Sequence, residues 1–170
     1  MNKLISCATV SFFLFTVSAF AAREVGETAR THLAMTLSGP STVRSGDRVE
    51  VGLTLTNSTK FVIVGTMQAS PNHAELSNGF SVRGPNGRQP AETTYALGLE
   101  GKGETASNDG ALLTSRVSFT LNPGDKLQES SPISDIYSIT VPGIYVIQAQ
   151  RHLNDGSVVK SNEFIVTIIP

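Results

Sequence analysis

The three histidines are the side chains most able to bind a transition metal, but their positions argue against a shared site. His32, His73 and His152 lie far apart in the sequence, without the close spacing that places two ligands on one element. Two segments, Asn108-Asp109-Gly110 and Asn154-Asp155-Gly156, carry oxygen atoms, but neither has the alternating acidic pattern of a calcium loop. Asn and Gly adopt the backbone conformations of tight turns, so we interpret both segments as turns. We therefore expect no metal and no other cofactor.

The sequence also lacks an arrangement of residues that indicates catalysis. It contains no Gly-x-Ser-x-Gly motif and no glycine-rich phosphate loop. A Ser-His-Asp set could be assembled from scattered residues, but any chain of this size allows that. The glutamates show no spacing that points to an acid/base pair; those considered are Glu50, Glu92, Glu100 and Glu104. We expect the protein not to be an enzyme.

The N-terminal residues have the pattern of a secretory signal peptide. Lys3 precedes an apolar run that ends in Ala19-Phe20-Ala21, a small-x-small cleavage pattern. We predict a signal peptide over 1–21 and a flexible leader over 22–31, with an uncleaved anchor as the alternative. The chain's single cysteine, Cys7, falls within the signal, so the mature chain needs no disulfide. We expect an exported protein, periplasmic or extracellular, and this cysteine usage is typical of a bacterial envelope.

Composition excludes two classes of partner for the mature chain. Over the full chain, thirteen basic and fourteen acidic residues give a formal net charge of −1, without a basic stripe that would bind nucleic acid. No apolar stretch after the signal is long enough to span a membrane. The absence of tryptophan removes the flat platform on which sugar-binding sandwiches often stack their ligands.

Alternating apolar and polar residues predict an all-β domain over 32–170. Val49, Val51, Leu53 and Leu55, for example, alternate with polar or small residues, as in a strand with one buried face. Asn57-Ser58-Thr59 matches a glycosylation motif, but we interpret it as the turn that ends this strand. No segment has a convincing helical period. The predicted strands are 32–38, 48–56, 61–66, 79–83, 112–121, 143–151 and 159–169.

The run from Ile136 to Ile147 resembles exported bacterial immunoglobulin-like and fibronectin-III-like β-sandwich domains, which are mostly of unknown function. In it, Pro142-Gly143 is followed two residues later by Tyr145. Segments 122–125 and 159–162 also resemble parts of such domains. The resemblance implies a single Greek-key immunoglobulin-like sandwich of about seven strands. It also implies structural roles for Pro142, Gly143 and Tyr145, whose hydroxyl would bond to the upstream backbone as a tyrosine corner.

Loop positions give a hypothesis for a binding site. If successive strands alternate in direction, the loops 57–60, 84–111 and 152–158 emerge at one end of the sandwich. An extra strand near Tyr95 would separate them, and a solvated insertion is the alternative interpretation of 84–111. The candidate binding residues are Arg88, Tyr95, Leu97, Leu99, Lys102, His152 and Asn154.

Three functions are compatible with these features. The first is a non-enzymatic exported interaction module that binds a protein or a surface polymer in the cell envelope. The second is an inhibitor of exported proteases that presents adjacent loops to a protease cleft. The third is a structural or assembly subunit that pairs through an edge strand. Strands 32–38 and 159–169 are the edges predicted for that role.

Overall fold

The computed structural model describes residues 33–68, 77–99 and 116–170, which belong to one compact unit, Thr31–Pro170. The predicted signal peptide, the predicted leader and Lys102 lie outside the described residues. Among the described residues, no helix is long and apolar enough to cross a membrane.

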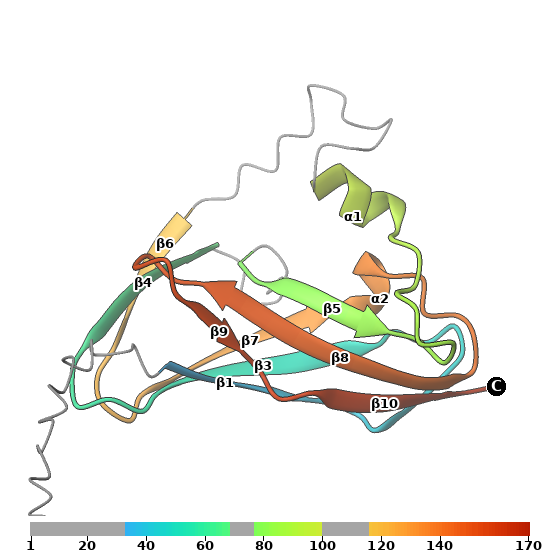
Figure 1. Ribbon diagram of the computed structural model, residues 1–170, viewed down its shortest axis with the longest axis horizontal. Coiled ribbons are helices and arrows are strands. Elements are labelled where there is room, and N and C mark those ends of the chain that lie inside the picture. Colours follow the sequence, from blue (N-terminus) through green and yellow to red (C-terminus); the bar gives the residue numbers. More distant parts are fainter. Residues whose placement is uncertain (1–32, 69–76, 100–115) are drawn as a thin grey trace, which may run out of the picture. The chain divides into compact units, whose positions relative to one another are not determined.

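The first sheet has the strand order β1-β3-β7, and both pairings are antiparallel (Figure 1). Its strands are β1 (Leu33–Ser38), β3 (Glu50–Asn57) and β7 (Lys126–Pro132). Burial alternates along β1 and β3, as the predicted period of two requires. The buried face of β3, which includes Leu53 and Leu55, forms one half of the core.

The second sheet has the order β2-β10-β8-β5, and β9 also pairs with β8. Strand β8 is its long central member, and β10 pairs with β2 in parallel. Inward-facing residues of β8 alternate with outward-facing ones, so that its buried residues face the core of the first sheet. The strands are β2 (Thr42–Arg44), β5 (Gly79–Arg83), β8 (Gly143–His152), β9 (Val158–Lys160) and β10 (Phe164–Ile169).

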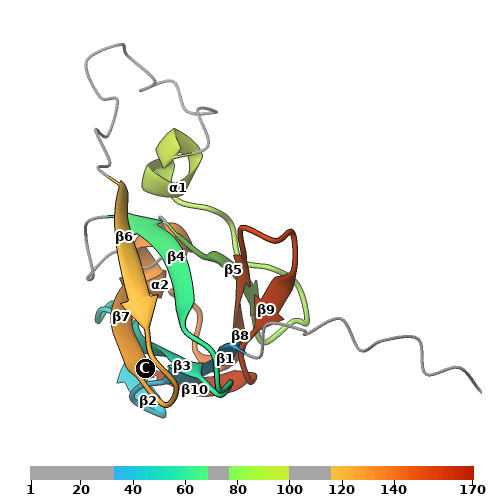
Figure 2. The same ribbon diagram turned by 90° about the vertical axis from the view of Figure 1, so that its left-hand side faces the viewer.

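Strands β4 (Ile63–Gln68) and β6 (Arg116–Leu121) form a separate antiparallel pair, here called the ribbon. Figure 1 shows the ribbon projecting beyond the ends of β3 and β7, and Figure 2 shows it from its own side. The buried side chain of Asn57 joins it to the first sheet. Its Nδ2 donates to the carbonyl oxygens of Phe61 and Leu121, at 2.7 and 2.9 Å. The Asn57-Ser58-Thr59 motif is therefore a strand-ending turn with an inaccessible asparagine.

Two short helices were not expected from the sequence. Helix α1 (Thr94–Leu99) occupies the place where an extra strand near Tyr95 was considered, and α2 (Ile133–Ile136) follows β7. Each is shorter than two turns, which is too short for a helical period to be recognised. The expectation of a helix-free domain was therefore wrong in these two places.

Together the two sheets and the ribbon make an all-β sandwich. The described residues contain ten strands, compared with about seven predicted. The prediction missed β2 and β7 and treated β9 and β10 as one strand. Strand β7 was missed because its sequence, KLQESSP, is polar. Its inward-facing positions include Glu129 and Ser131, which are buried although they are not apolar.

The start of β8 is closely packed around Tyr145. The hydroxyl of Tyr145 donates to the carbonyl oxygen of Val141 at 2.8 Å, which is the contact that the resemblance implies. Burial raises the pKa of Tyr145 above its usual value of 10.0. Gly143 has a φ of +143°, and a Cβ at this position would lie 2.4 Å from Cγ of Pro85. This turn therefore requires glycine for both its conformation and its close contact.

Candidate functional site

The predicted binding residues do not form one surface, because the loops that carry them begin at opposite ends of the sandwich. Strands β5 and β8 are antiparallel neighbours, with Gly79 opposite Gln150 and Arg83 opposite Val146. The loop after β5 therefore starts beside the first residues of β8, whereas the 153–157 turn follows its last residues (Figure 1). The prediction that 84–111 and 152–158 emerge at one end was wrong.

The uncounted strand β7 explains this error. It lies between β6 and β8 in the sequence, so it changes the number of strand reversals between the two loops. Loop 84–93 and α1 hold four of the predicted residues at one end: Arg88, Tyr95, Leu97 and Leu99. His152 and Asn154 lie at the other end, where the structure has a hollow.

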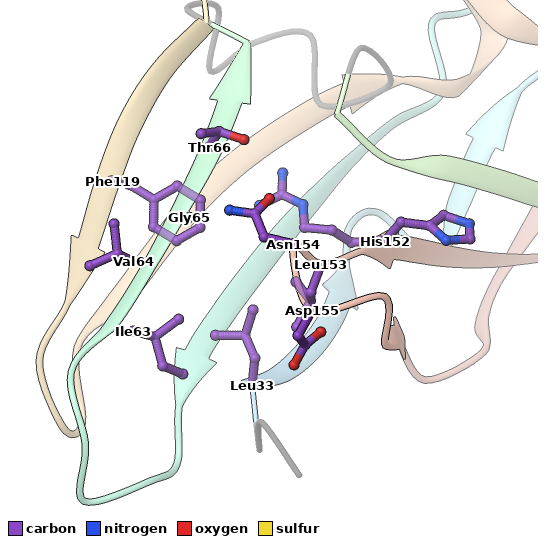
Figure 3. Close-up of a pocket in the computed structure, with 11 residues that line it drawn as sticks. Leu33, Ile63, Val64, Gly65, Thr66, Phe119, His152, Leu153, Asn154 and Asp155 are labelled. Atoms are coloured by element: carbon purple, nitrogen blue, oxygen red, sulfur yellow. The ribbon is translucent and has the colours of Figure 1, made fainter. Parts of the chain in front are cut away.

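This hollow, here called the apolar hollow, lies between the ribbon and the 153–157 turn and has a volume of about 170 Å³ (Figure 3). Its apolar lining residues include Leu33, Ile63, Phe119 and Leu153. The close-up shows Asn154 directed toward β4 across the hollow, while the ring of His152 points away from the ribbon.

Four consecutive β4 residues, 63–66, line the apolar hollow. Successive side chains of a strand point to opposite faces, so a wall made of consecutive residues presents the edge of the strand. One edge of β4 pairs with β6, and the other has no strand partner within the described residues. An unpaired edge offers a row of backbone N–H and C=O groups to an incoming chain.

A second hollow, here called the polar hollow, adjoins the first and has a volume of about 220 Å³. The two share Thr66, Arg151, His152 and Asn154. Arg116 of β6 also lines the polar hollow and forms no ion pair with any described residue. No aspartate or glutamate is among the described residues that line it.

Arg151, which lies beneath both hollows, is only 3% exposed. Its Nη2 lies 2.7 and 3.1 Å from the two carboxylate oxygens of Glu129, and its Nε donates to Oδ1 of Asn78 at 2.9 Å. The pair joins β8 of one sheet to β7 of the other. Nη1 is also buried, and it has no hydrogen-bond partner among the described residues. Buried donors are rarely left unpaired, so this group requires an explanation.

The ribbon supplies the side chain that lies over this guanidinium. The ring centroid of Phe119 is 5.9 Å from Cζ of Arg151, at the outer limit for a cation–π contact. Phe119 lies opposite Gly65 in the ladder, and a Cβ at position 65 would be 2.4 Å from the ring Cζ. Gly65 thus allows the ring to rest on the backbone of β4.

The ribbon and the two residues that precede β4 also expose large apolar side chains. Phe61 is 63% exposed and Val64 is 64% exposed, and Val62 and Val117 are exposed nearby. A two-stranded ribbon has little stability of its own, so this apolar surface adds to a segment that is open to a partner.

The site offers hydrogen-bond donors, an open strand edge and apolar contact surface. In residues 33–68, 77–99 and 116–170, no group of three or more His, Cys, Asp or Glu side chains could hold a metal ion.

Sequence reasoning missed Arg151 although the signal was present. The inward-facing alternation of Tyr145, Ile147 and Ala149 reaches Arg151 when it is extended by two residues. An arginine at an inward-facing strand position indicates a buried ion pair or a site. Its partner Glu129 could not be recognised, because β7 itself was not predicted.

Comparisons with known proteins identify no family for the chain. No protein-family model matches it, and no curated protein matches it. Among solved structures, it is similar to the CARDB domain of a Pyrococcus furiosus protein, determined in complex with di-metal ions. The sequences are 14% identical, and the match covers 81% of this chain and 87% of that chain with a TM-score of 0.39.

Proposed function

We propose that this protein is a non-enzymatic, exported binding module that takes an extended segment of a partner protein onto the free edge of β4. The sandwich that presents this edge is, in this proposal, an immunoglobulin-like Greek key, which the strand orders β1-β3-β7 and β2-β10-β8-β5 support. The observation that carries the proposal is the wall of the apolar hollow, formed by four consecutive β4 residues. Such an edge pairs with a polypeptide backbone rather than with a sugar polymer.

The edges expected from the sequence are less suited to this role. The side-chain amide of Asn162 accepts from the backbone N–H of Leu37 at 2.8 Å and donates to its carbonyl oxygen at 3.3 Å. It therefore takes up the groups that a pairing strand would need at this point of β1. Strand β10 has β8 on one side and β2 on the other.

The protease-inhibitor hypothesis loses its geometric support. It required adjacent loops that enter one cleft, whereas the loop after β5 and the turn after β8 begin at opposite ends of these paired strands. For the edge-pairing hypothesis, the proposed pairing edge is now that of β4 instead of the edges of β1 and β10.

A displayed library of short peptides, selected on the purified protein, supplies a defined ligand for the test. We expect a selected peptide to slow hydrogen exchange of every second backbone amide within 63–66, because the amides that do not donate to β6 would donate to the added strand. N-methylation of the peptide amides that face β4 should abolish binding. Protection confined to loop 84–93, or binding that tolerates every N-methylation, would contradict strand addition.

A pair of matched variants locates the site. Asn154→Trp places a bulky neutral side chain in the apolar hollow, facing β4, and should weaken peptide binding by about tenfold or more. Thr140→Trp makes a comparable change at an exposed position before the opposite end of β8 and should leave the affinity unchanged. Equal effects of the two variants would place recognition elsewhere.

A further inference from the structure

We infer that the buried guanidinium of Arg151, together with Arg116, is a recognition site for a carboxylate on the bound segment. This inference rests on the proposed function and adds a chemical requirement to it. The carboxylate belongs either to an acidic side chain or to the C-terminus of the segment.

The first argument is the unused hydrogen-bonding capacity of Arg151. Its Nε and Nη2 are committed to Asn78 and Glu129, whereas Nη1 has no acceptor in the described part of the chain. A structural role in joining the two sheets explains the contact with Glu129, but it does not explain why Nη1 is buried without an acceptor. Leaving such a donor buried and unpaired is unfavourable, so an acceptor that reaches it is stabilised. Arg151 lines both hollows, which is where an acceptor can approach.

The second argument is charge. The Arg151–Glu129 pair is neutral as a unit, but Arg116, which forms no ion pair with any described residue, adds a positive charge to the polar hollow. None of the described residues lining this hollow is acidic, so none of them repels an anion. A hydrogen bond from a guanidinium to a carboxylate is charge-assisted and about twice as strong as a neutral one.

The neighbouring hollow orients the ligand. Asp155 lines the apolar hollow on the side of the 153–157 turn, whereas Arg116 lines the polar hollow, so an acidic group is favoured near Arg116. Leu33, Ile63 and Leu153 suit an apolar side chain. Side chains two residues apart share one face of a strand. The preferred segment therefore carries an apolar residue and, on the same face, a carboxylate.

Nη1 is closed to bulk solvent, so the carboxylate must displace whatever covers it. Phe119 is the aromatic ring over the guanidinium, and it belongs to the two-stranded ribbon rather than to either main sheet. In this inference the ring gives way to the carboxylate, and because Phe119 belongs to the ribbon its displacement leaves the pairing of β8 intact.

Acetate titration of the unmodified protein tests the site without any peptide. At constant ionic strength, acetate should shift the NMR signal of the Arg151 side chain saturably, whereas acetamide and chloride should not. Arg116→Gln, a change at an exposed residue, should weaken this acetate response by several-fold. An Arg151 signal that acetate does not move, or that acetamide moves equally, overturns the inference.

Peptide variants identify the source of the carboxylate. If the site binds an acidic side chain, replacing that residue of a selected peptide, Glu→Gln or Asp→Asn, should lower the affinity of the peptide by about tenfold or more. If the site binds the C-terminal carboxylate instead, amidation of the peptide C-terminus should cause the same loss of affinity. Whichever change lowers the affinity should have a smaller effect on binding to the Arg116→Gln variant than on binding to the unmodified protein. If neither change matters while β4 remains protected, the carboxylate inference fails and strand addition stands. If no peptide binds β4, the proposed function fails, and acetate still decides the inference.

Discussion

The two ends of β8 both bury a polar side chain between the sheets, but the two side chains differ in how far their hydrogen-bond donors are used. At the first end, Tyr145 donates its single proton to Val141, so its donor capacity is used. At the other end, Arg151 pairs with Glu129 and Asn78 but keeps Nη1 unpaired among the described residues. The first end is closed by Gly143 and Pro85 in contact, whereas the second borders two hollows.

This difference separates a stabilising contact from a site. Satisfied buried groups fix a unique packing, and replacing them alters stability alone. A partly satisfied buried cation next to a hollow has a remaining donor that a ligand can use. The comparison therefore predicts that variants at the two ends will differ in whether they change binding, beyond any change in stability.

The largest expected effect is that of breaking the buried ion pair. Arg151→Met leaves the carboxylate of Glu129, whose side chain is 1% exposed, without its cation, and should lower the free energy of unfolding by about 3–5 kcal/mol. Denaturant titration measures this change. The double variant Arg151→Met/Glu129→Met should recover most of the loss, because it removes both buried charges.

The exposed pair Arg83–Glu163 is the matched control. Its nitrogen–oxygen distance is 2.8 Å, close to that of the buried pair, but both side chains are 57% exposed. Arg83→Met should cost no more than about 1 kcal/mol. Similar losses for Arg83→Met and Arg151→Met would show that burial does not distinguish the two pairs.

The next effect concerns the ribbon. Gly65→Ala pushes against the Phe119 ring and should destabilise the fold by about 1–3 kcal/mol through overpacking. It should also reduce binding of a selected peptide, because the displaced Phe119 ring no longer lies in the same position over the guanidinium of Arg151. Gly52→Ala on β3 is the control, since its nearest contact is the Ser38 hydroxyl at 3.3 Å. A Gly65→Ala protein that binds peptide normally would exclude Phe119 as a determinant of the site.

The part of the fold with strong alternation was predictable from the sequence. Strands β1, β3 and β8 bury every second residue with few exceptions, and their positions follow from that pattern. The polar strand β7 was not predictable, because Glu129 and Ser131 are buried by pairing and hydrogen bonding rather than by hydrophobicity. Tertiary contacts determine its structure, and they are invisible to a local pattern.

The candidate site was even less predictable from local sequence patterns than the fold. Asn154 and His152 were predicted as binding residues and do border the hollows, but for a reason that the sequence did not contain. They were grouped with Arg88 and Tyr95, and the missing β7 made that grouping wrong. The edge of β4 and the partner of Arg151 depend on which strands pair, which spacing along one chain cannot reveal.

The smallest expected effect is that of removing the Tyr145 hydroxyl. Tyr145→Phe should cost about 0.5–1.5 kcal/mol in unfolding free energy, the value of one hydrogen bond, and should leave peptide affinity unchanged. The raised pKa adds a pH signature. Above pH 10 the unfolded chain loses this proton more readily than the folded chain, so stability falls as the pH rises toward the folded pKa. In Tyr145→Phe this part of the decline should disappear, whereas in the wild type it should remain. If the two proteins lost stability in parallel above pH 10, Tyr145 would not be the buried group that titrates, and the closed end of β8 would need another explanation.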